Sequence, residues 1–255
     1  MFYSNLTVKI KSHSKMFYIK HLTFSIIILS SFMCTNSYAA AAGMHVVLAN
    51  KWLEVQEKKY SDEDKAAFIV GTLFPDIRYL GTVKRSSTHE ENINNKVIKN
   101  TKNMFIAGKR LHAFVDIERE IFAEKYGIYN HTPGKTYKQK VKFLKLLEDE
   151  IIWNKFNQLK TVEQLNYPLF VEEKNQNVSS LELMSWRMVL KYYFARKPSE
   201  TFLDSKTAIE KLSLRIAAKD LDDMLPTLRS LSLDPIFIDY TNSLVSHMEE
   251  LFKKT

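Results

Sequence analysis

The nine residues GKRLHAFVD, at positions 108–116, lie within a stretch that has the period of an amphipathic helix. Residues four apart lie one above the other on a helix, so Gly108, His112 and Asp116 share one face. That face is the one that should be apolar. A histidine and a carboxylate one turn apart on an inward face form either a buried polar pair or half of a metal site, and Gly108 leaves room for another helix or a substrate to approach.

Helical periodicity extends from this stretch through almost all of the chain after residue 43. Predicted helices cover residues 45–58, 61–70, 100–126, 136–158 and 181–195, and two or three more lie within 200–253. Gly71 and Gly127 are expected to end two of these helices. The helix at 181–195 is apolar on most sides, so we expect it at the centre of the core. No segment has the pattern of a strand, and the sequence therefore predicts an all-α, single multi-helix domain.

Residues 72–94 (TLFPDIRYLGTVKRSSTHEENIN) contain proline, glycine and a serine cluster. We expect a long connection with little regular structure, and connections of this length in a compact domain are usually functional. Further along the chain, Thr161–Gln164 and Ser179–Glu182 both match the capping-box pattern of a helix start.

The first 39 residues combine a basic start, a short apolar run and the small residues of Ser37-Tyr38-Ala39. These features indicate a secretory signal peptide cleaved after Ala39, which leaves 40–255 as one domain of about 216 residues. The apolar run is shorter than the roughly 20 residues that a membrane span requires. An uncleaved N-terminal anchor is the alternative, and either Met1 or Met16 can be the start.

Charge and cysteine content narrow the class of protein. Four lysines lie in the leader, so the formal charge falls from +8 for the whole chain to +4 for the mature one. A value this modest does not suit a dedicated duplex-DNA binder. The single cysteine, Cys34, also lies in the leader, so a secreted or periplasmic bacterial protein would have to be stabilised by its core, by a metal, or by both.

Most of the remaining histidines lie in one part of the mature chain, together with two carboxylates. They are His45, Asp76, His89, His112, Asp116 and His131, whereas His247 stands alone. Imidazole and carboxylate are the ligands of zinc sites that keep a position open for water. Each residue has an ordinary explanation as a core histidine, a turn residue or a solvated side chain, so the argument depends on their order and spacing.

That order resembles the zinc-dependent phospholipase C family, whose fold is shared with the fungal single-strand-specific nucleases. The shared pattern is an early histidine, a loop Pro-Asp, a Thr-His soon after, and a helical G-x3-H-x3-D. The chain matches it at His45, Pro75-Asp76, Thr88-His89 and Gly108…His112…Asp116. The match covers residues 40–116, about a third of the mature chain, and depends on the four motifs occurring in this order.

The resemblance implies an all-α fold of the phospholipase C and nuclease type with a cluster of up to three zinc ions. Asp76, His89, His112 and Asp116 would surround one zinc. Asp116 would bridge to a second zinc that is held by His45 and by the mature N-terminal residue, here Ala40.

The chain departs from the family after this point. The histidine expected six residues after Asp116 is Phe122, and the acid expected four residues after a distal histidine is Leu251 in the case of His247. His131 is the nearby alternative ligand. We therefore expect one or two zinc ions, and an inactive member of the family is an alternative.

The resemblance also implies phosphodiester hydrolysis by zinc-activated water, with Asp76 as ligand and as general base or water-orienting carboxylate. Arg78, Tyr79 and Tyr129 are predicted substrate contacts, with solvated or packing roles as alternatives. A phospholipid is the expected substrate, reached by transient contact of a monomer with a membrane surface and without a stable nucleic-acid complex. The alternatives are a single-strand nuclease, which needs a basic groove and aromatic platforms, and a non-catalytic periplasmic metal-binding protein.

Overall fold

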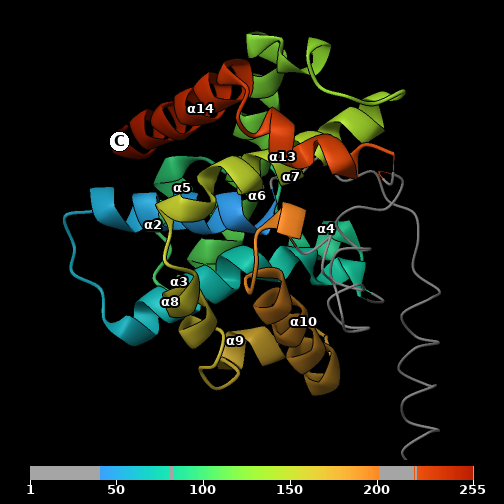
Figure 1. The fold of residues 1–255 in the computed structure, drawn as a ribbon. Coiled ribbons are helices and arrows are strands. Elements are labelled where there is room, and N and C mark those ends of the chain that lie inside the picture. The colour runs from blue at the N-terminus through green and yellow to red at the C-terminus, as the bar shows by residue number, and fades with distance from the viewer. Residues whose placement is uncertain (1–40, 81–82, 201–220, 222, 255) are drawn as a thin grey trace, which may run out of the picture.

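The computed structural model describes residues 41–80, 83–200, 221 and 223–254 (Figure 1). The predicted leader, Ala40 and the predicted helical segment at 201–220 lie outside the described residues. The described residues form helices and no strand, which confirms the prediction of an all-α protein. Among them, no helix combines the length and hydropathy that crossing a bilayer requires.

The α-helices are α2 (Ala42–Val55), α3 (Asp62–Leu73), α4 (Arg85–Thr88), α5 (Asn95–Lys99), α6 (Met104–Tyr126), α7 (Tyr137–Ile152), α8 (Gln158–Gln164), α9 (Val171–Lys174), α10 (Ser180–Tyr193), α13 (Leu228–Leu231) and α14 (Pro235–Lys253). Short 3-10 helices are η1 (Phe74–Tyr79), η2 (Ile128–Asn130), η3 (Trp153–Lys155) and η4 (Leu225–Thr227). In Figure 1, α2, α3 and α6 lie in the middle of the molecule, with α14 on one side and α10 on the other. The core therefore forms around these middle helices.

Two glycines let α3 and α6 cross at very short range. A Cβ atom on Gly108 would lie 2.2 Å from the carbonyl oxygen of Phe68, and one on Gly71 would lie 2.1 Å from that of Phe105. The space beside Gly108 is thus filled by another helix. The prediction that Gly71 ends its helix is wrong, because α3 continues to Leu73 and needs the glycine for this crossing.

Helix ends follow the local chemistry in most places. Gly127 adopts a φ of 76° and ends α6 as predicted, a conformation that favours glycine. Ser179 and Glu182 form the predicted capping box at the start of α10. The capping box predicted at Thr161 is wrong, because Thr161 lies inside α8 and Asn157 caps that helix instead.

The connection between α3 and α6 is more regular than the sequence indicates, because it contains η1, α4 and α5. Pro75 lies in the first turn of η1, where its missing N–H costs no hydrogen bond. His89 directly follows α4 as its C-cap residue. Asp76 therefore lies within a short helix, and His89 directly follows one.

The start of α2 is held from outside the helix. The backbone N–H groups of Gly43 and Met44 donate to the two carboxylate oxygens of Asp149, both at 2.7 Å, and the Tyr193 hydroxyl donates to the same carboxylate at 2.6 Å. A carboxylate at this position satisfies N–H groups that a helix start leaves without partners. Asp149 thereby fixes the first turn of α2, which carries His45.

The prediction that residues 181–195 lie at the centre of the core is wrong. One face of α10 is buried, but Leu181 is 71% exposed, Met184 60% and Met188 43%. Figure 1 shows α10 at the edge of the molecule. When a helix is apolar on most sides, its sequence pattern does not show which of those sides is exposed to water.

Candidate metal centre

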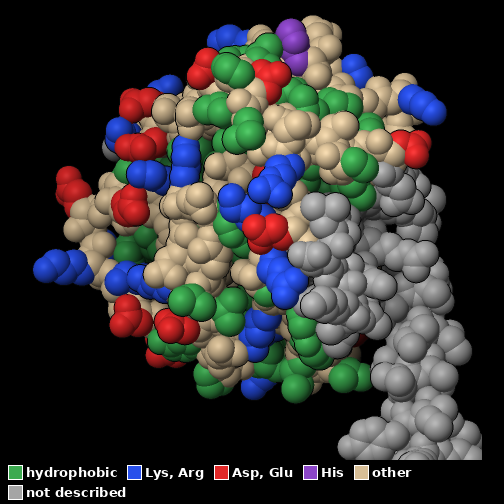
Figure 2. All heavy atoms as spheres, viewed as in Figure 1, with side chains coloured by type: hydrophobic (Ala, Val, Ile, Leu, Met, Phe, Trp, Pro, Cys, Tyr) green, Lys and Arg blue, Asp and Glu red, His purple; other side chains and the backbone are tan. Residues whose placement is uncertain are grey.

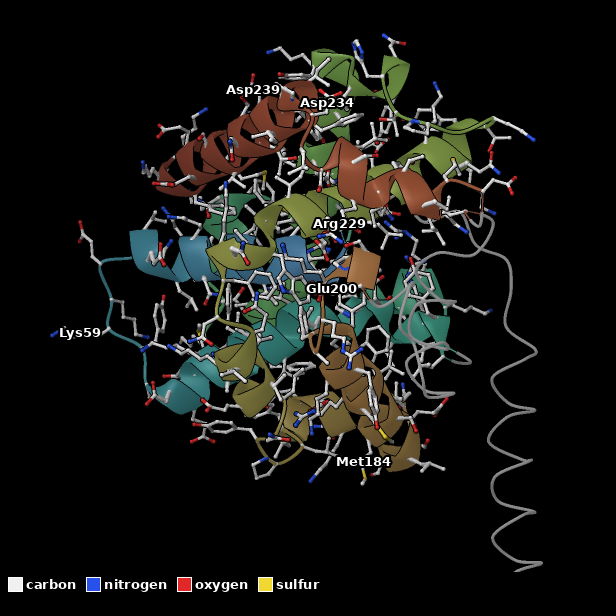
Figure 3. All side chains as sticks on the ribbon, in the orientation of Figure 1. Lys59, Met184, Glu200, Arg229, Asp234 and Asp239 are labelled. Atoms are coloured by element: carbon white, nitrogen blue, oxygen red, sulfur yellow. The ribbon has the colours of Figure 1, made fainter. Side chains whose placement is uncertain are left out.

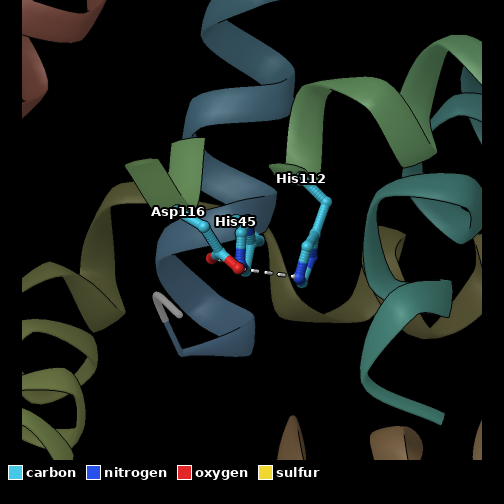
Figure 4. A group of neighbouring side chains, drawn as sticks. All are labelled: His45, His112 and Asp116. Atoms are coloured by element: carbon cyan, nitrogen blue, oxygen red, sulfur yellow. Dashed lines mark ion pairs between the residues drawn. The ribbon is translucent and has the colours of Figure 1, made fainter. Parts of the chain in front are cut away.

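Five side chains from four separate elements converge in the interior. His45 comes from the first turn of α2, Asp76 from η1, His89 from the end of α4, and His112 and Asp116 from α6. The ligand atoms of His45, His112 and Asp116 lie within 4.8 Å of one another, as do those of Asp76, His89 and His112. Figure 4 shows His45, His112 and Asp116 pointing toward one another from α2 and α6.

Three donor atoms form a nearly equilateral triangle. The Nε2 atoms of His89 and His112 are 3.1 Å apart, and Asp116 Oδ2 lies 3.3 Å from the first and 3.4 Å from the second. A tetrahedral zinc site with bonds of about 2.0–2.1 Å has donor atoms about 3.3–3.4 Å apart. The triangle thus has the size of one face of a zinc coordination sphere, and Asp76 lies beside it.

Hydrogen bonds behind the two rings direct Nε2 into the cluster. His112 Nδ1 donates to the carbonyl oxygen of Thr72 at 2.8 Å, because a carbonyl only accepts. The Thr88 hydroxyl donates to the carbonyl of Arg85 and therefore accepts from His89 Nδ1, at 2.8 Å. In the neutral rings, both Nε2 atoms then carry lone pairs that face each other, and a cation between them would remove the repulsion. Metal-ligating histidines characteristically donate their other N–H in this way.

His45 is buried without a hydrogen bond. Its side chain is 1% exposed, and neither ring nitrogen has a hydrogen-bond partner among the described residues. The ring stacks on that of His112 with centroids 3.9 Å apart, and Nε2 lies 3.3 Å from Asp116 Oδ1. Buried polar atoms are almost always hydrogen-bonded, so the Nε2 atom of His45 indicates that a partner atom is missing from the cluster.

The charges of the cluster suit a cation. Burial lowers the pKa of His45 to about 4 and also lowers the pKa of His89, so both rings are neutral at pH 7. Burial acts against the charge of Asp116, but the neighbouring His112 outweighs it and holds the Asp116 pKa well below its usual range. The pKa of Asp76 is lowered in the same way, by His112 and Arg78. Neutral imidazole and ionised carboxylate are the forms that bind a metal.

Two arginines near the cluster have different environments. Arg78, predicted from sequence as a substrate contact, is buried and donates to Asp76 Oδ1 at 3.3 Å and to the Tyr79 hydroxyl at 3.0 Å. Both predicted contacts, Arg78 and Tyr79, are thus engaged with each other. Arg85, which the sequence did not single out, has Nη2 3.7 Å from Asp116 Oδ2, and its buried Nη1 has no hydrogen-bond partner among the described residues. The Arg85 side chain is 34% exposed.

Lys145 is a second cation that sequence reasoning missed. It is buried on α7, and burial together with Arg119 lowers its pKa to about 7, although Asp116 and Asp76 raise it. One signal was available, because Val141, Lys145 and Ile152 follow one inward stripe of the helix. This helix contains four lysines, so the sequence alone favours a solvated side chain for each of them.

Other predicted ligands and contacts lie elsewhere. His131 is exposed at the end of η2 and belongs to neither ligand group that the described residues form. Tyr129 is buried, and its hydroxyl bonds to Glu120 and Arg119. Phe122 stacks on His247 with ring centroids 4.9 Å apart, and neither residue belongs to a ligand group that the described residues form.

Comparisons of the chain with models of protein families, with curated proteins and with solved structures find no match. A function for the chain must therefore be argued from the motif order and from the geometry of the five-residue cluster.

Proposed function

We propose that the chain is a zinc-dependent phosphodiesterase of phospholipase C type. The observation that supports this most strongly is the triangle of His89, His112 and Asp116 donor atoms, whose edges of 3.1–3.4 Å match the face of a zinc site. The motif order that resembles the phospholipase C family supports the choice of reaction.

The donor set fits zinc better than other divalent ions. Two imidazole nitrogens and carboxylate oxygens suit zinc, whereas calcium and magnesium prefer oxygen alone. His89, His112 and Asp116 would hold one ion, and Asp76 would lie beside the fourth position, which the attacking water would take. His45, with Nε2 at 3.3 Å from Asp116 Oδ1, would hold a second ion, which would bind one of its two ring nitrogens that lack hydrogen-bond partners.

A bound zinc supplies hydroxide from water near neutral pH and polarises the phosphoryl group. The residues of the chain do the rest. Asp76 is ionised and accepts a hydrogen bond from the attacking water, which it orients toward phosphorus. Arg85 donates its unpaired Nη1 to a phosphoryl oxygen, where charge develops as the P–O bond to the leaving alcohol breaks. Thr72 and Thr88 keep the two imidazoles in the orientation that this geometry requires.

A non-catalytic protein is the second candidate, and one observation favours it. Burial lowers the pKa of His112, but Asp116 outweighs it and raises the pKa above the usual value, so a protonated His112 could pair with Asp116 in place of a metal. This arrangement leaves both nitrogens of His45 without partners, whereas a metal ion would bind one of them, and we therefore prefer the metal site.

The test uses purified protein that has not been exposed to a chelator. We expect at least one equivalent of zinc per chain by atomic emission, and hydrolysis of phosphatidylcholine faster than of single-stranded DNA assayed beside it. The variant His131→Ala, outside the cluster, should match the wild type in both respects. Less than half an equivalent of zinc and no hydrolysis would favour the non-catalytic protein, and faster cleavage of DNA would favour the nuclease.

A further inference from the structure

The outward face of α10 is an apolar stripe on the surface. Leu181, Met184 and Met188 are spaced at i, i+3 and i+7, so they lie along one side of the helix, and all three are exposed. Figure 3 shows Met184 at the edge of the molecule with its side chain directed away from the ribbon. We name these three residues, with Lys191 and Tyr192 further along the same side, the α10 outer face.

The charges that follow this face are positive, whereas Glu182 lies beside its first residue, Leu181, and forms the capping box with Ser179. From Leu183 to Lys197 the chain contains no acidic residue. Arg187 turns inward to pair with Glu173, but Lys191, Arg196 and Lys197 stay at least partly at the surface. Figure 2 shows hydrophobic side chains together with Lys or Arg side chains at the lower edge of the molecule, where Figure 1 places α10. An apolar stripe with lysine and tyrosine beside it is typical of a helix that lies in a lipid headgroup layer.

The opposite face of the same helix packs toward the candidate metal centre. Trp186 Nε1 donates to the carbonyl oxygen of Leu73 at 3.0 Å, and Leu73 directly precedes η1, which carries Asp76. α10 also packs on η1 itself. The helix that exposes the apolar stripe is therefore part of the wall that positions Asp76.

We propose that the α10 outer face binds the surface of a phospholipid bilayer that contains anionic lipids. The stripe provides apolar area for the acyl boundary, and the cations that follow it attract lipid phosphates. A second protein copy fits this face less well, since a stable interface buries roughly 800 Å² on each partner and three side chains along one helix cover far less. The proposal rests on the proposed function for its purpose, because docking by α10 would bring a lipid substrate to the protein.

The test measures vesicle binding apart from hydrolysis. The full chain is sedimented with vesicles of phosphatidylcholine mixed with phosphatidylglycerol, and with vesicles of phosphatidylcholine alone. We expect binding to the mixed vesicles to exceed binding to the neutral ones and to weaken with added salt. The triple variant Leu181→Ser, Met184→Ser, Met188→Ser should bind the mixed vesicles about tenfold or more weakly, because apolar area is lost at unchanged charge.

The matched control is Ile117→Ser, Ile121→Ser on α6. These two residues are also exposed, at 44% and 54%, but acidic side chains such as Glu118 and Glu124 accompany them. This variant should bind vesicles as the wild type does. If the triple variant melts at a lower temperature than the wild type, the single variant Met184→Ser replaces it. We expect this single variant to bind the mixed vesicles several-fold more weakly than the wild type does.

Three outcomes would overturn the proposal. Equal vesicle binding by the triple variant and the wild type would remove α10 from docking. Absence of vesicle binding by the wild type would do the same, as would a dimer, detected by light scattering, that the triple variant loses. If the wild type binds vesicles through α10 but hydrolyses neither vesicle lipid nor a short-chain soluble phosphatidylcholine, the docking surface stands and the proposed function fails.

Discussion

Helix α6 carries two buried polar groups in succession, and they differ in how their hydrogen bonds are satisfied. In the first, His112 and Asp116 meet three side chains from other elements, and the Nε2 atoms of His89 and His112 lie 3.1 Å apart. In the second, Arg119 donates to Glu148 through Nε and Nη2 at 2.9–3.1 Å and to the Tyr129 hydroxyl at 3.2 Å. The α6 residues His112, Asp116 and Arg119, and Glu148 beside them, are buried.

The difference separates a structural network from a site that requires a ligand. Tyr240 donates to Glu148 at 2.9 Å, so the second group joins α6, α7, η2 and α14 and is complete in itself. The first group leaves His45 without a hydrogen-bond partner. A buried network that is fully satisfied stabilises a fold, whereas one that lacks a partner atom indicates a place for an ion.

The largest effect that this comparison predicts concerns His112. His112→Ala removes a donor atom that both ligand groups share, so we expect zinc to be lost and hydrolysis of phosphatidylcholine to fall by at least about 10³-fold, equivalent to several kcal/mol. The melting temperature should fall as well, because bound zinc stabilises the folded state. Kinetics and calorimetry measure both, with His131→Ala as control. An active and equally stable His112→Ala protein would remove the residue from the site.

The next effect concerns stability alone. Arg119→Met leaves Glu148 buried without its cation, and we expect the free energy of unfolding in urea to fall by about 3–5 kcal/mol. Zinc content per folded chain should not change, because Arg119 is not among the ligands. The double variant Arg119→Met, Glu148→Gln should recover part of the loss. A variant with wild-type stability that has lost its zinc would reverse the roles that we assign to the two groups.

The two arginines beside the cluster sharpen the comparison. Arg85→Gln should reduce kcat/KM by roughly 10–100-fold, the effect of losing one charge-assisted hydrogen bond of about 1.5–3 kcal/mol. Zinc content and melting temperature should stay at wild-type values. Arg78→Gln, which breaks the buried contact to Asp76, should instead lower the melting temperature. If Arg85→Gln retains full kcat/KM, Arg85 does not contact the phosphoryl group.

The last effect is a pH dependence of stability that originates beside the second group and is the smallest of the four over any one pH unit. Burial raises the pKa of Asp149 to about 7, above the value near 3.9 of an unfolded chain. Between these values the folded state holds a proton that the unfolded state has released, so stability falls as pH rises, by up to about 1.4 kcal/mol per pH unit.

Denaturation of Asp149→Asn isolates this contribution. The lowered pKa of His45, at about 4, acts in the opposite direction in the same window, so the difference between variant and wild type is the quantity to measure. The difference should depend on pH between about 4 and 7 and should level off outside this range. A constant difference would show that Asp149 does not titrate in this range.

The sequence was sufficient for those features that depend on local spacing. The i, i+4 relation of His112 and Asp116 follows from helix geometry, and helical period alone predicted the all-α fold. The wrong predictions depend on long-range packing. The sequence predicts that Gly71 ends a helix, whereas in the structure this glycine allows α6 to cross α3. The sequence also predicts residues 181–195 at the centre of the core, whereas one apolar face of this segment is exposed.

The same limit explains the residues that were missed or misplaced. Arg85 belongs to no motif, and it stands out only because its Nη2 lies 3.7 Å from Oδ2 of Asp116, a residue distant in sequence. Lys145 is hidden among other lysines of α7. The sequence predicts Tyr129 as a substrate contact, yet its hydroxyl accepts a hydrogen bond from Arg119 in the interior.

Zinc K-edge X-ray absorption of the purified protein tests the central claim most directly, namely that His89, His112 and Asp116 form one face of a single metal site. We predict four nitrogen or oxygen neighbours at about 2.0–2.1 Å, with the outer-shell scattering of at least two imidazoles. An absorber without imidazole scattering would contradict the account, as would a protein that takes up less than half an equivalent of zinc.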